Sequence, residues 1–145
     1  MQAQYKLILK QAQALVADEI DSIAITANLS ALLFHSFERI NWLGFYFLRG
    51  DELVLGPFQG NVACTRIPIG QGVCGTAFQN METLIVDDVH LFEGHIACDA
   101  ASESEIVVPF SSSKIEGVLD VDSPEKKRFS EDEAELLKAI VGLLV

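Results

Sequence analysis

The fold follows from WLGFYFLRGDELVLGPF, which is residues 42–58. Residues 42–48 and 52–58 are dominated by aromatic and aliphatic side chains, and residues 49–51 between them are Arg-Gly-Asp. Aromatic and branched residues favour extended strands, and glycine next to aspartate favours a tight turn. This stretch therefore predicts a β-hairpin in the first half of the chain.

Further strands are expected on the C-terminal side of the hairpin. Short apolar runs bounded by turn residues occur at 65–67, 84–86, 105–110 and 117–121, and a short helix is predicted at 72–80. Longer helical periodicity is confined to the two ends of the chain. Helices at the ends with hairpin-like strands between them are typical of an α+β fold and not of alternating βαβ units. We therefore expect a central antiparallel sheet, flanked by N- and C-terminal helices that cover one of its faces.

The terminal helices are predicted from apolar residues spaced three and four apart. The last helix has the clearest start, because Ser130 and Glu133 form a capping-box pair. For the second helix, Asp18 or Asp21 is the candidate cap. The apolar residues of the three helices are Tyr5, Ile8, Leu9, Ala12, Leu15 and Val16; Ile20, Ile23, Ala24, Ala27, Ala31 and Phe34; and Leu136, Leu137, Ile140, Val141 and Leu144.

Size and charge limit the classes of function. The chain has 145 residues, half of them apolar, so residues 1–145 are expected to form one domain around a single core. Its net charge of -11 repels nucleic-acid phosphates and anionic lipid surfaces. No apolar run reaches the roughly 18 residues that a membrane helix needs, and the N-terminus shows no secretory signal. We therefore expect a cytoplasmic protein with no nucleic-acid and no membrane partner.

One long segment, residues 87–104, lacks regular periodicity. Loops of this length in compact domains are usually functional or disordered, and the apolar residues of this one indicate that it packs against the domain. Cys98 lies in it, between His95 and Asp99 and beside small alanines. Because these neighbours leave the sulfur approachable, Cys98 is the best candidate for a reactive thiolate.

The chain has two further cysteines, Cys64 and Cys74, and no Cys-x-x-Cys pair. For Cys74, which lies in the predicted short helix, an inert, buried thiol is as good an interpretation as a reactive one. Zinc bound by the cysteines with His90 and His95 is a weaker alternative, because the spacing fits no usual zinc pattern. A serine hydrolase is not supported, because no Gly-x-Ser-x-Gly motif occurs.

Several motifs, in order along the chain, carry a resemblance to a known family. They are GPFQG at 56–60 followed by Cys64, GQGVCGTA at 70–77, GHIACDAASESEIVVP at 94–109 and GVLDVDSP at 117–124. Together they closely resemble the free methionine-(R)-sulfoxide reductases, which are catalytic GAF domains. The resemblance implies a GAF-like central antiparallel sheet between helices, usually assembled as a homodimer.

The resemblance also implies an activity and roles for single residues. Cys98 would be the nucleophile that reduces free methionine sulfoxide, Cys64 the principal resolving thiol and Cys74 a secondary one. The resulting disulfide would be reduced by thioredoxin as external reductant, with no bound cofactor and no metal. The implied substrate-binding residues are the aromatics Trp42 and Tyr46, at the methyl-sulfur end, and the carboxylates Glu105, Asp120 and Asp122.

Sulfoxide chemistry explains why carboxylates belong beside the cysteine. The sulfoxide oxygen can leave only if it is protonated, so attack by a thiolate requires a nearby acid. Glu105 and Asp120 lie on predicted strands and Asp122 directly follows one, so the three carboxylates can share one face of the sheet, where clustered like charges raise the pKa of at least one of them. Glu103 departs from the family pattern, in which a neutral polar residue is usual, and the turn at 111–114 is one residue shorter.

Two competing interpretations concern the same residues. A GAF-type sensor would bind a small molecule without catalysis, although the three matched cysteines favour an enzyme. Trp42 and Tyr46 could also be core aromatics of the sheet without contact to a substrate.

Overall fold

The structure, a computed structural model, describes all residues from 1 to 145. Its elements are α1 (Ala3–Val16), α2 (Ser22–Ser36), β1 (Trp42–Arg49), β2 (Glu52–Gly60), β3 (Arg66–Pro68), α3 (Gly72–Asn80), β4 (Leu84–Val86), the 3-10 helix η1 (Val89–Leu91), β5 (Ser104–Ser111), β6 (Glu116–Ser123) and α4 (Glu131–Gly142). Every predicted helix and strand is present. No helix is both long enough and apolar enough to cross a membrane.

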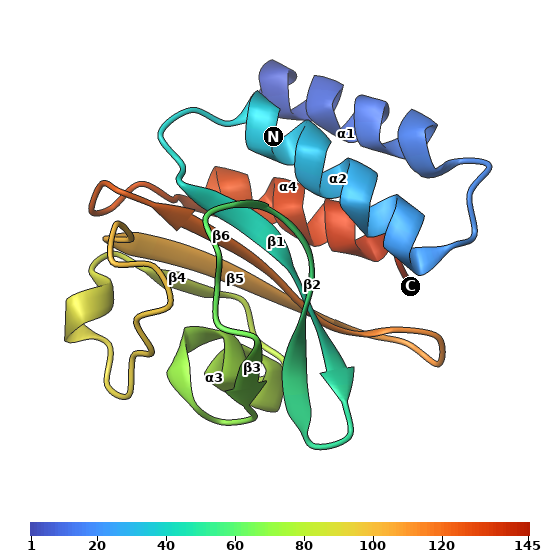
Figure 1. Ribbon diagram of the computed structural model, residues 1–145. Coiled ribbons are helices and arrows are strands. Elements are labelled where there is room, and N and C mark those ends of the chain that lie inside the picture. Colours follow the sequence, from blue (N-terminus) through green and yellow to red (C-terminus); the bar gives the residue numbers. More distant parts are fainter.

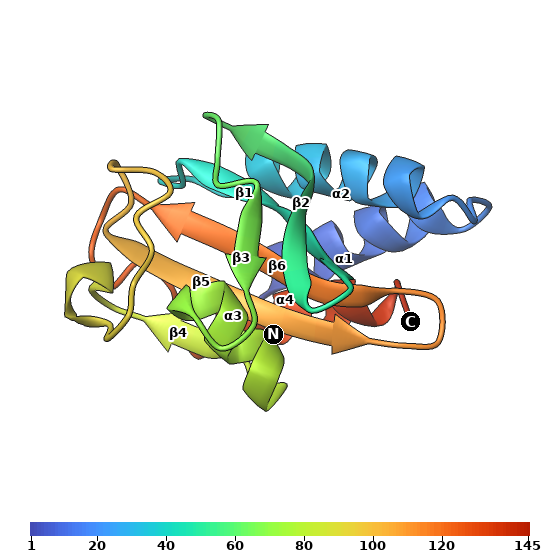
Figure 2. The ribbon, with the colours of Figure 1, turned by 60° about the horizontal axis from the view of Figure 1, so that its bottom comes forward.

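The strands form one antiparallel sheet in the order β3-β2-β1-β6-β5-β4 (Figures 1 and 2). The predicted hairpin is β1 with β2, whose turn residue Gly50 has a φ of 68°. Glycine adopts this left-handed conformation without a steric penalty. The β1–β2 register shifts between Gly44 and Tyr46, as at a β-bulge. The α+β class and the antiparallel sheet are confirmed.

Helices cover both faces of the sheet, but unequally (Figure 1). α1, α2 and α4 lie on one face and enclose the larger core cluster, to which Phe45, Ile106 and Leu119 of the sheet belong. α3 lies on the other face, where its residue Val73 joins Tyr46 in a second cluster. The expectation that only one face is covered was therefore wrong. A short helix that begins with a glycine carries too little periodicity to reveal which surface it covers.

α2 buries a different face from the one predicted. Its fully buried residues are Leu29 and Leu33 with the polar Thr26 and Ser30, whereas Ile23 is 55% exposed. The hydroxyls of Thr26 and Ser30 each donate to the carbonyl four residues earlier, at 2.7 Å, which satisfies them inside the core. Because α2 is apolar on nearly all sides, periodicity does not select a face, and contact with α1, β1 and β2 does.

Both expected helix caps are formed. Of the two candidates for α2, Asp21 is the cap, since its carboxylate accepts hydrogen bonds from the backbone N–H of Ile23 and Ala24, each at 3.0 Å. At α4, Ser130 and Glu133 form the predicted capping box. Each cap satisfies backbone N–H groups that have no partner within the helix.

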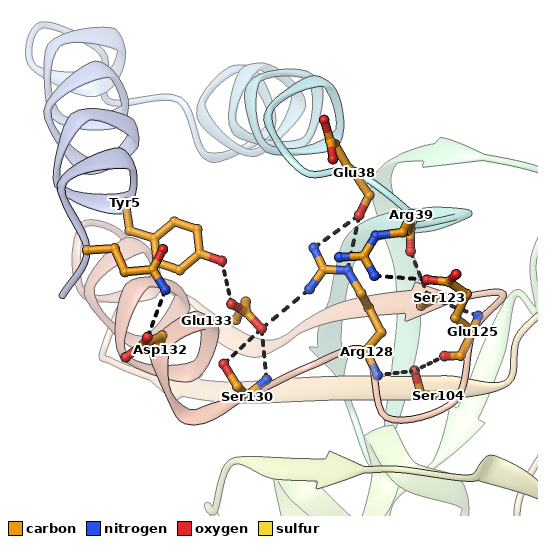
Figure 3. A network of polar contacts seen from close by, with 11 residues as sticks. Tyr5, Glu38, Arg39, Ser104, Ser123, Glu125, Arg128, Ser130, Asp132 and Glu133 are labelled. Carbon is orange, nitrogen blue, oxygen red and sulfur yellow. Dashed lines mark hydrogen bonds and ion pairs between the residues drawn. The ribbon is translucent and has the colours of Figure 1, made fainter.

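A buried polar network joins α1 and α4 to the segment before β1 (Figure 3). Glu133 accepts hydrogen bonds from Tyr5 Oη, from the Ser130 backbone N–H at 2.8 Å and from Arg128 Nη1 at 3.4 Å. Arg128 also donates to the Glu38 carbonyl from Nε at 3.1 Å and from Nη2 at 3.0 Å. Since the Arg128 and Glu133 side chains are only 7% and 6% exposed, this is a buried ion pair, in which each side-chain nitrogen and oxygen has at least one hydrogen-bond partner.

Two serines of this region fix the adjacent ends of β5 and β6 (Figure 3). Ser104 Oγ donates to the Glu125 carbonyl at 2.5 Å, and Ser123 Oγ donates to the Arg39 carbonyl at 2.6 Å. Both serines are completely buried. Each is next in sequence to one of the candidate carboxylates, so these hydrogen bonds hold the strand ends on which the carboxylates lie.

Replacing Glu133 by alanine should strongly destabilise the fold. The change leaves the Arg128 guanidinium buried without its partner, which costs about 3 kcal/mol, or a decrease in Tm of about 10 °C in a chain of this size. Thermal unfolding followed by circular dichroism measures this decrease. Glu135→Ala is the matched control, because Glu135 lies on the same helix with a side chain that is 59% exposed. A similar Tm for the two variants would contradict a structural role of the buried pair.

Candidate active site

Three carboxylates converge on the face of the sheet that carries α3. Glu105 on β5 lies directly opposite Asp122 on β6, and Asp120 precedes Asp122 by two residues. Because side chains alternate along a strand, all three point away from the large helical layer. They are 7%, 8% and 6% exposed for Glu105, Asp122 and Asp120 respectively. The sheet therefore concentrates three acidic groups in a nearly buried position.

An aromatic wall stands next to the carboxylates on β1. Trp42 pairs with Asp122 in the β1–β6 register, and its ring lies 5.9 Å from that of Tyr46 and 5.2 Å from that of Phe58, centre to centre. Trp42 Nε1 donates to the Asn61 carbonyl at 3.1 Å. Both Trp42 and Tyr46 are 2% exposed, so they are core aromatics that also line a cavity.

The loop between β2 and β3 meets the loop before β5 through a disulfide that joins Cys64 to Cys98. Tyr46 Oη donates to the Cys64 carbonyl at 2.9 Å, which ties the disulfide to the aromatic wall. Both cysteines are only half-buried. The two cysteines expected to be the nucleophile and the resolving thiol are therefore adjacent, and both residues are partly exposed.

Cys74 lies on the opposite wall, in α3. It is buried and free, and its S–H donates to Glu105 Oε2 across 3.9 Å. α3 begins at Gly72, whose φ of 64° and whose contact with the Ile96 side chain leave no comfortable space for a larger residue. This helix start brings Cys74 beneath the loop that carries Cys98.

Hydrogen bonds to the residue before β1 and to the last residue of β6 hold the Cys98 loop over the site. Asn41 Nδ2 donates to Asp99 Oδ2 at 3.0 Å and to Ser102 Oγ at 3.1 Å. The backbone N–H of Glu103 donates to the Ser123 carbonyl at 2.7 Å. The sequence did not reveal Asn41 and Ser102, because small polar residues at loop ends carry no pattern that distinguishes an anchor from an ordinary loop residue.

These elements enclose a cavity of about 40 Å³. Its lining includes seven of the eight residues predicted to act in the site. The eighth, Cys64, is joined to the lining by its disulfide to Cys98. A single water needs roughly 10–15 Å³ measured in this way. In the disulfide state the cavity therefore holds only a few water-sized groups.

The cavity is acidic, and its ionisable groups influence one another. Burial raises the pKa values of Glu105, Asp120 and Asp122 well above the usual carboxyl range, and their mutual repulsion raises them further. Burial and the carboxylates also raise the pKa of the Cys74 thiol. The lining contains no lysine or arginine, and burial lowers the pKa of His95, its one histidine. The site therefore favours bound protons or a bound cation.

The zinc set considered from the sequence is not assembled. Cys64 and Cys98 are joined to each other, and His90 is exposed and pairs with Glu103, with 2.5 Å between Nε2 and Oε2. Sulfurs in a disulfide are not thiolates and do not serve as zinc ligands. That alternative is wrong for this state of the chain.

Comparison with known proteins agrees with this geometry. The GAF domain family matches residues 25–145. Protein YtsP of Bacillus subtilis is 58% identical over 130 residues, which are 88% of this chain and 80% of that protein. Free methionine-R-sulfoxide reductase of Escherichia coli is 52% identical over 132 residues, which are 90% of this chain and 80% of that protein.

A solved structure extends the similarity to three dimensions. The X-ray structure of free methionine-R-sulfoxide reductase from Neisseria meningitidis, in complex with its substrate, has a TM-score of 0.92 and 46% sequence identity. The similarity covers 97% of this chain and 85% of that chain. The chain therefore belongs to the GAF domain family and, within it, to the free methionine-R-sulfoxide reductases.

Proposed function

We propose that the chain reduces free methionine-(R)-sulfoxide to methionine in the cavity between the sheet, α3 and the Cys98 loop. The observation that carries this proposal is the position of the Cys64–Cys98 disulfide beside a cavity with three buried carboxylates. A redox-active cysteine pair and a source of protons are the two requirements of sulfoxide reduction.

Cys98 is the nucleophile in this proposal. Its thiolate attacks the sulfoxide sulfur while the oxygen is protonated, which forms a sulfur–sulfur bond. This bond and the sulfur–oxygen bond then break as the hydroxyl passes to Cys98, and methionine leaves. The oxygen remains on Cys98 as the hydroxyl of a sulfenic acid, so the substrate sulfur is reduced by two electrons and the cysteine sulfur is oxidised by two. The position of Cys98 in the cavity lining supports this role.

The carboxylates supply the proton and bind the substrate. The raised pKa values favour a proton on at least one of Glu105, Asp120 and Asp122, which donates it to the sulfoxide oxygen, and the remaining negative charge binds the substrate ammonium group. Their burial and mutual proximity support both roles. The aromatic wall of Trp42 and Tyr46 contacts the methyl-sulfur end of the substrate.

Cys64 resolves the sulfenic acid. Its thiol forms the bond to Cys98 and releases the oxygen as water, which produces the disulfide present in this structure. An external dithiol then reduces this disulfide by exchange, and thioredoxin fills this role. Because the cavity is small in the disulfide state, reduction precedes entry of the next substrate. Cys74, buried and with a raised pKa, remains a secondary thiol.

Three further expectations from the sequence remain predictions. They are a cytoplasmic location, assembly as a homodimer, and folding of residues 1–145 as one domain. The enclosed site also favours a free amino acid over a residue within a peptide, because a peptide would bury amide groups without hydrogen-bond partners there.

Turnover by the purified protein tests the proposal. With thioredoxin, thioredoxin reductase and NADPH, free R-methionine sulfoxide should cause NADPH consumption, and an N-acetylated peptide sulfoxide should react at least about 100-fold more slowly in kcat/KM. Methionine formed with dithiothreitol but not with thioredoxin would contradict only the choice of reductant. No methionine with either reductant would contradict the enzymatic function and favour a sensor.

A further inference from the structure

We propose that the chain, in its disulfide form, binds a thiophilic divalent cation of the Zn²⁺ type through Cys74, Glu105 and Asp120. The site differs from the zinc set considered from the sequence, because it uses none of the histidines and neither cysteine of the disulfide. It goes beyond the proposed reaction, which needs no metal.

The three ligand atoms are already close together. One atom each from Cys74, Glu105 and Asp120 lie within 4.8 Å of one another, and Cys74 Sγ is 3.9 Å from Glu105 Oε2. Neighbouring ligands around tetrahedral zinc are about 3.5 Å apart, as follows from zinc–sulfur and zinc–oxygen bonds of roughly 2.3 and 2.1 Å. Small side-chain adjustments would therefore complete three ligands of a site whose fourth position is open to water.

A second observation points to a missing ligand at the same place. Asp120 is 6% exposed, and its Oδ1 has no hydrogen-bond partner. A buried carboxylate oxygen without a partner is costly, and a coordinated cation would remove that cost. Asp120 lines the cavity, whose space for a few water-sized groups is also space for an ion and its water ligands.

The charge and type of the ligands select the cation. No lysine or arginine lines the cavity, so an entering cation displaces no resident positive side chain. One thiolate with two carboxylates suits Zn²⁺ better than Mg²⁺ or Ca²⁺, which prefer oxygen ligands only. Binding exchanges the thiol proton of Cys74, and any proton held by Glu105 or Asp120, for the metal and releases these protons to solvent, so no change of oxidation state is involved.

The disulfide form allows the site to be tested by itself. In that form Cys74 is the only free thiol, so reduced Cys64 and Cys98 cannot contribute zinc ligands. Trp42 is the only tryptophan of the chain and lines the same cavity, so its fluorescence reports on occupancy. Titration of oxidised, metal-free protein with zinc chloride, without reductant, should give saturable binding of one equivalent by calorimetry, with a parallel change in fluorescence.

Three variants distinguish this site from zinc bound at the acidic surface. Cys74→Ser and Asp120→Asn should each weaken zinc binding by about 100-fold or more, since each removes a direct ligand. Glu103→Gln is the matched control, because it removes an acidic group from the neighbouring loop surface, outside the cavity lining. Its zinc affinity should equal that of the wild type.

Two results would overturn the proposal. One is the absence of saturable zinc binding by the oxidised wild type, and the other is binding that is unchanged in Cys74→Ser. The titration contains neither sulfoxide nor reductant, so its outcome is independent of whether the chain reduces methionine sulfoxide. Circular dichroism of each variant confirms that a loss of binding does not reflect a loss of fold.

Discussion

Cys98→Ser should abolish methionine sulfoxide reduction. A serine hydroxyl at this position cannot form the sulfenic acid, and neither remaining cysteine occupies its place: Cys64 comes from the other loop, and Cys74 is buried with a raised pKa. The loss of the nucleophile should lower kcat by at least about 1,000-fold. Methionine release measured by chromatography, with dithiothreitol as reductant, gives this value.

Cys64→Ser is the matched control, since it removes the other half of the same disulfide. This variant keeps the nucleophile, so the reduced protein should release one equivalent of methionine in a burst. Continued turnover with thioredoxin should then be slow, because the sulfenic acid on Cys98 lacks its resolving thiol. A burst in Cys98→Ser, or none in Cys64→Ser, would reverse the roles assigned to the two residues.

Asp120→Asn should lower activity and raise stability at the same time. The amide cannot supply a proton or a negative charge, so kcat/KM for free R-methionine sulfoxide should decrease by about 100-fold or more. The same change removes one of three mutually repelling buried carboxyl groups. We expect a gain of about 1–2 kcal/mol at pH 7, or an increase in Tm of about 2–8 °C.

The pH dependence of stability should also show that the charged forms of these carboxyl groups destabilise the fold. Because the folded pKa values of Glu105, Asp120 and Asp122 are raised, the folded chain binds more protons than the unfolded chain above the unfolded carboxyl pKa of about 4. The contribution of these groups to stability is thus fully present below about pH 4 and is lost as pH rises through their folded values. Asp120→Asn should weaken this loss.

Urea unfolding between pH 4 and 8, in metal-free buffer, measures the stability gain at pH 7 and the pH dependence of stability. Glu116→Gln is the control, because Glu116 lies at the other end of β6 and outside the cavity lining. It should leave both kcat/KM and the pH dependence near those of the wild type. An Asp120→Asn variant that is less stable than the wild type at pH 7 would contradict this prediction. It would mean that contacts other than those described above stabilise the buried charge of Asp120.

Local patterns were sufficient for the elements of the fold. The hairpin, the capping box and the terminal helices were predicted because turn residues, caps and amphipathic spacing act over a few residues of sequence. α2 shows the limit of this approach. Its apolar residues surround the helix, so the buried face, with Leu29 and Leu33, depends on which elements pack against it.

The site divides in the same way. The family motifs indicated which cysteines, carboxylates and aromatics to consider, and sheet periodicity already allowed the carboxylates to share a face. Sequence could not indicate that Asn41 anchors the Cys98 loop, that Cys74 lies against Glu105 or that α3 covers the second face of the sheet. These contacts join residues far apart in the chain, and only tertiary packing, which sets burial and charge proximity, decides them.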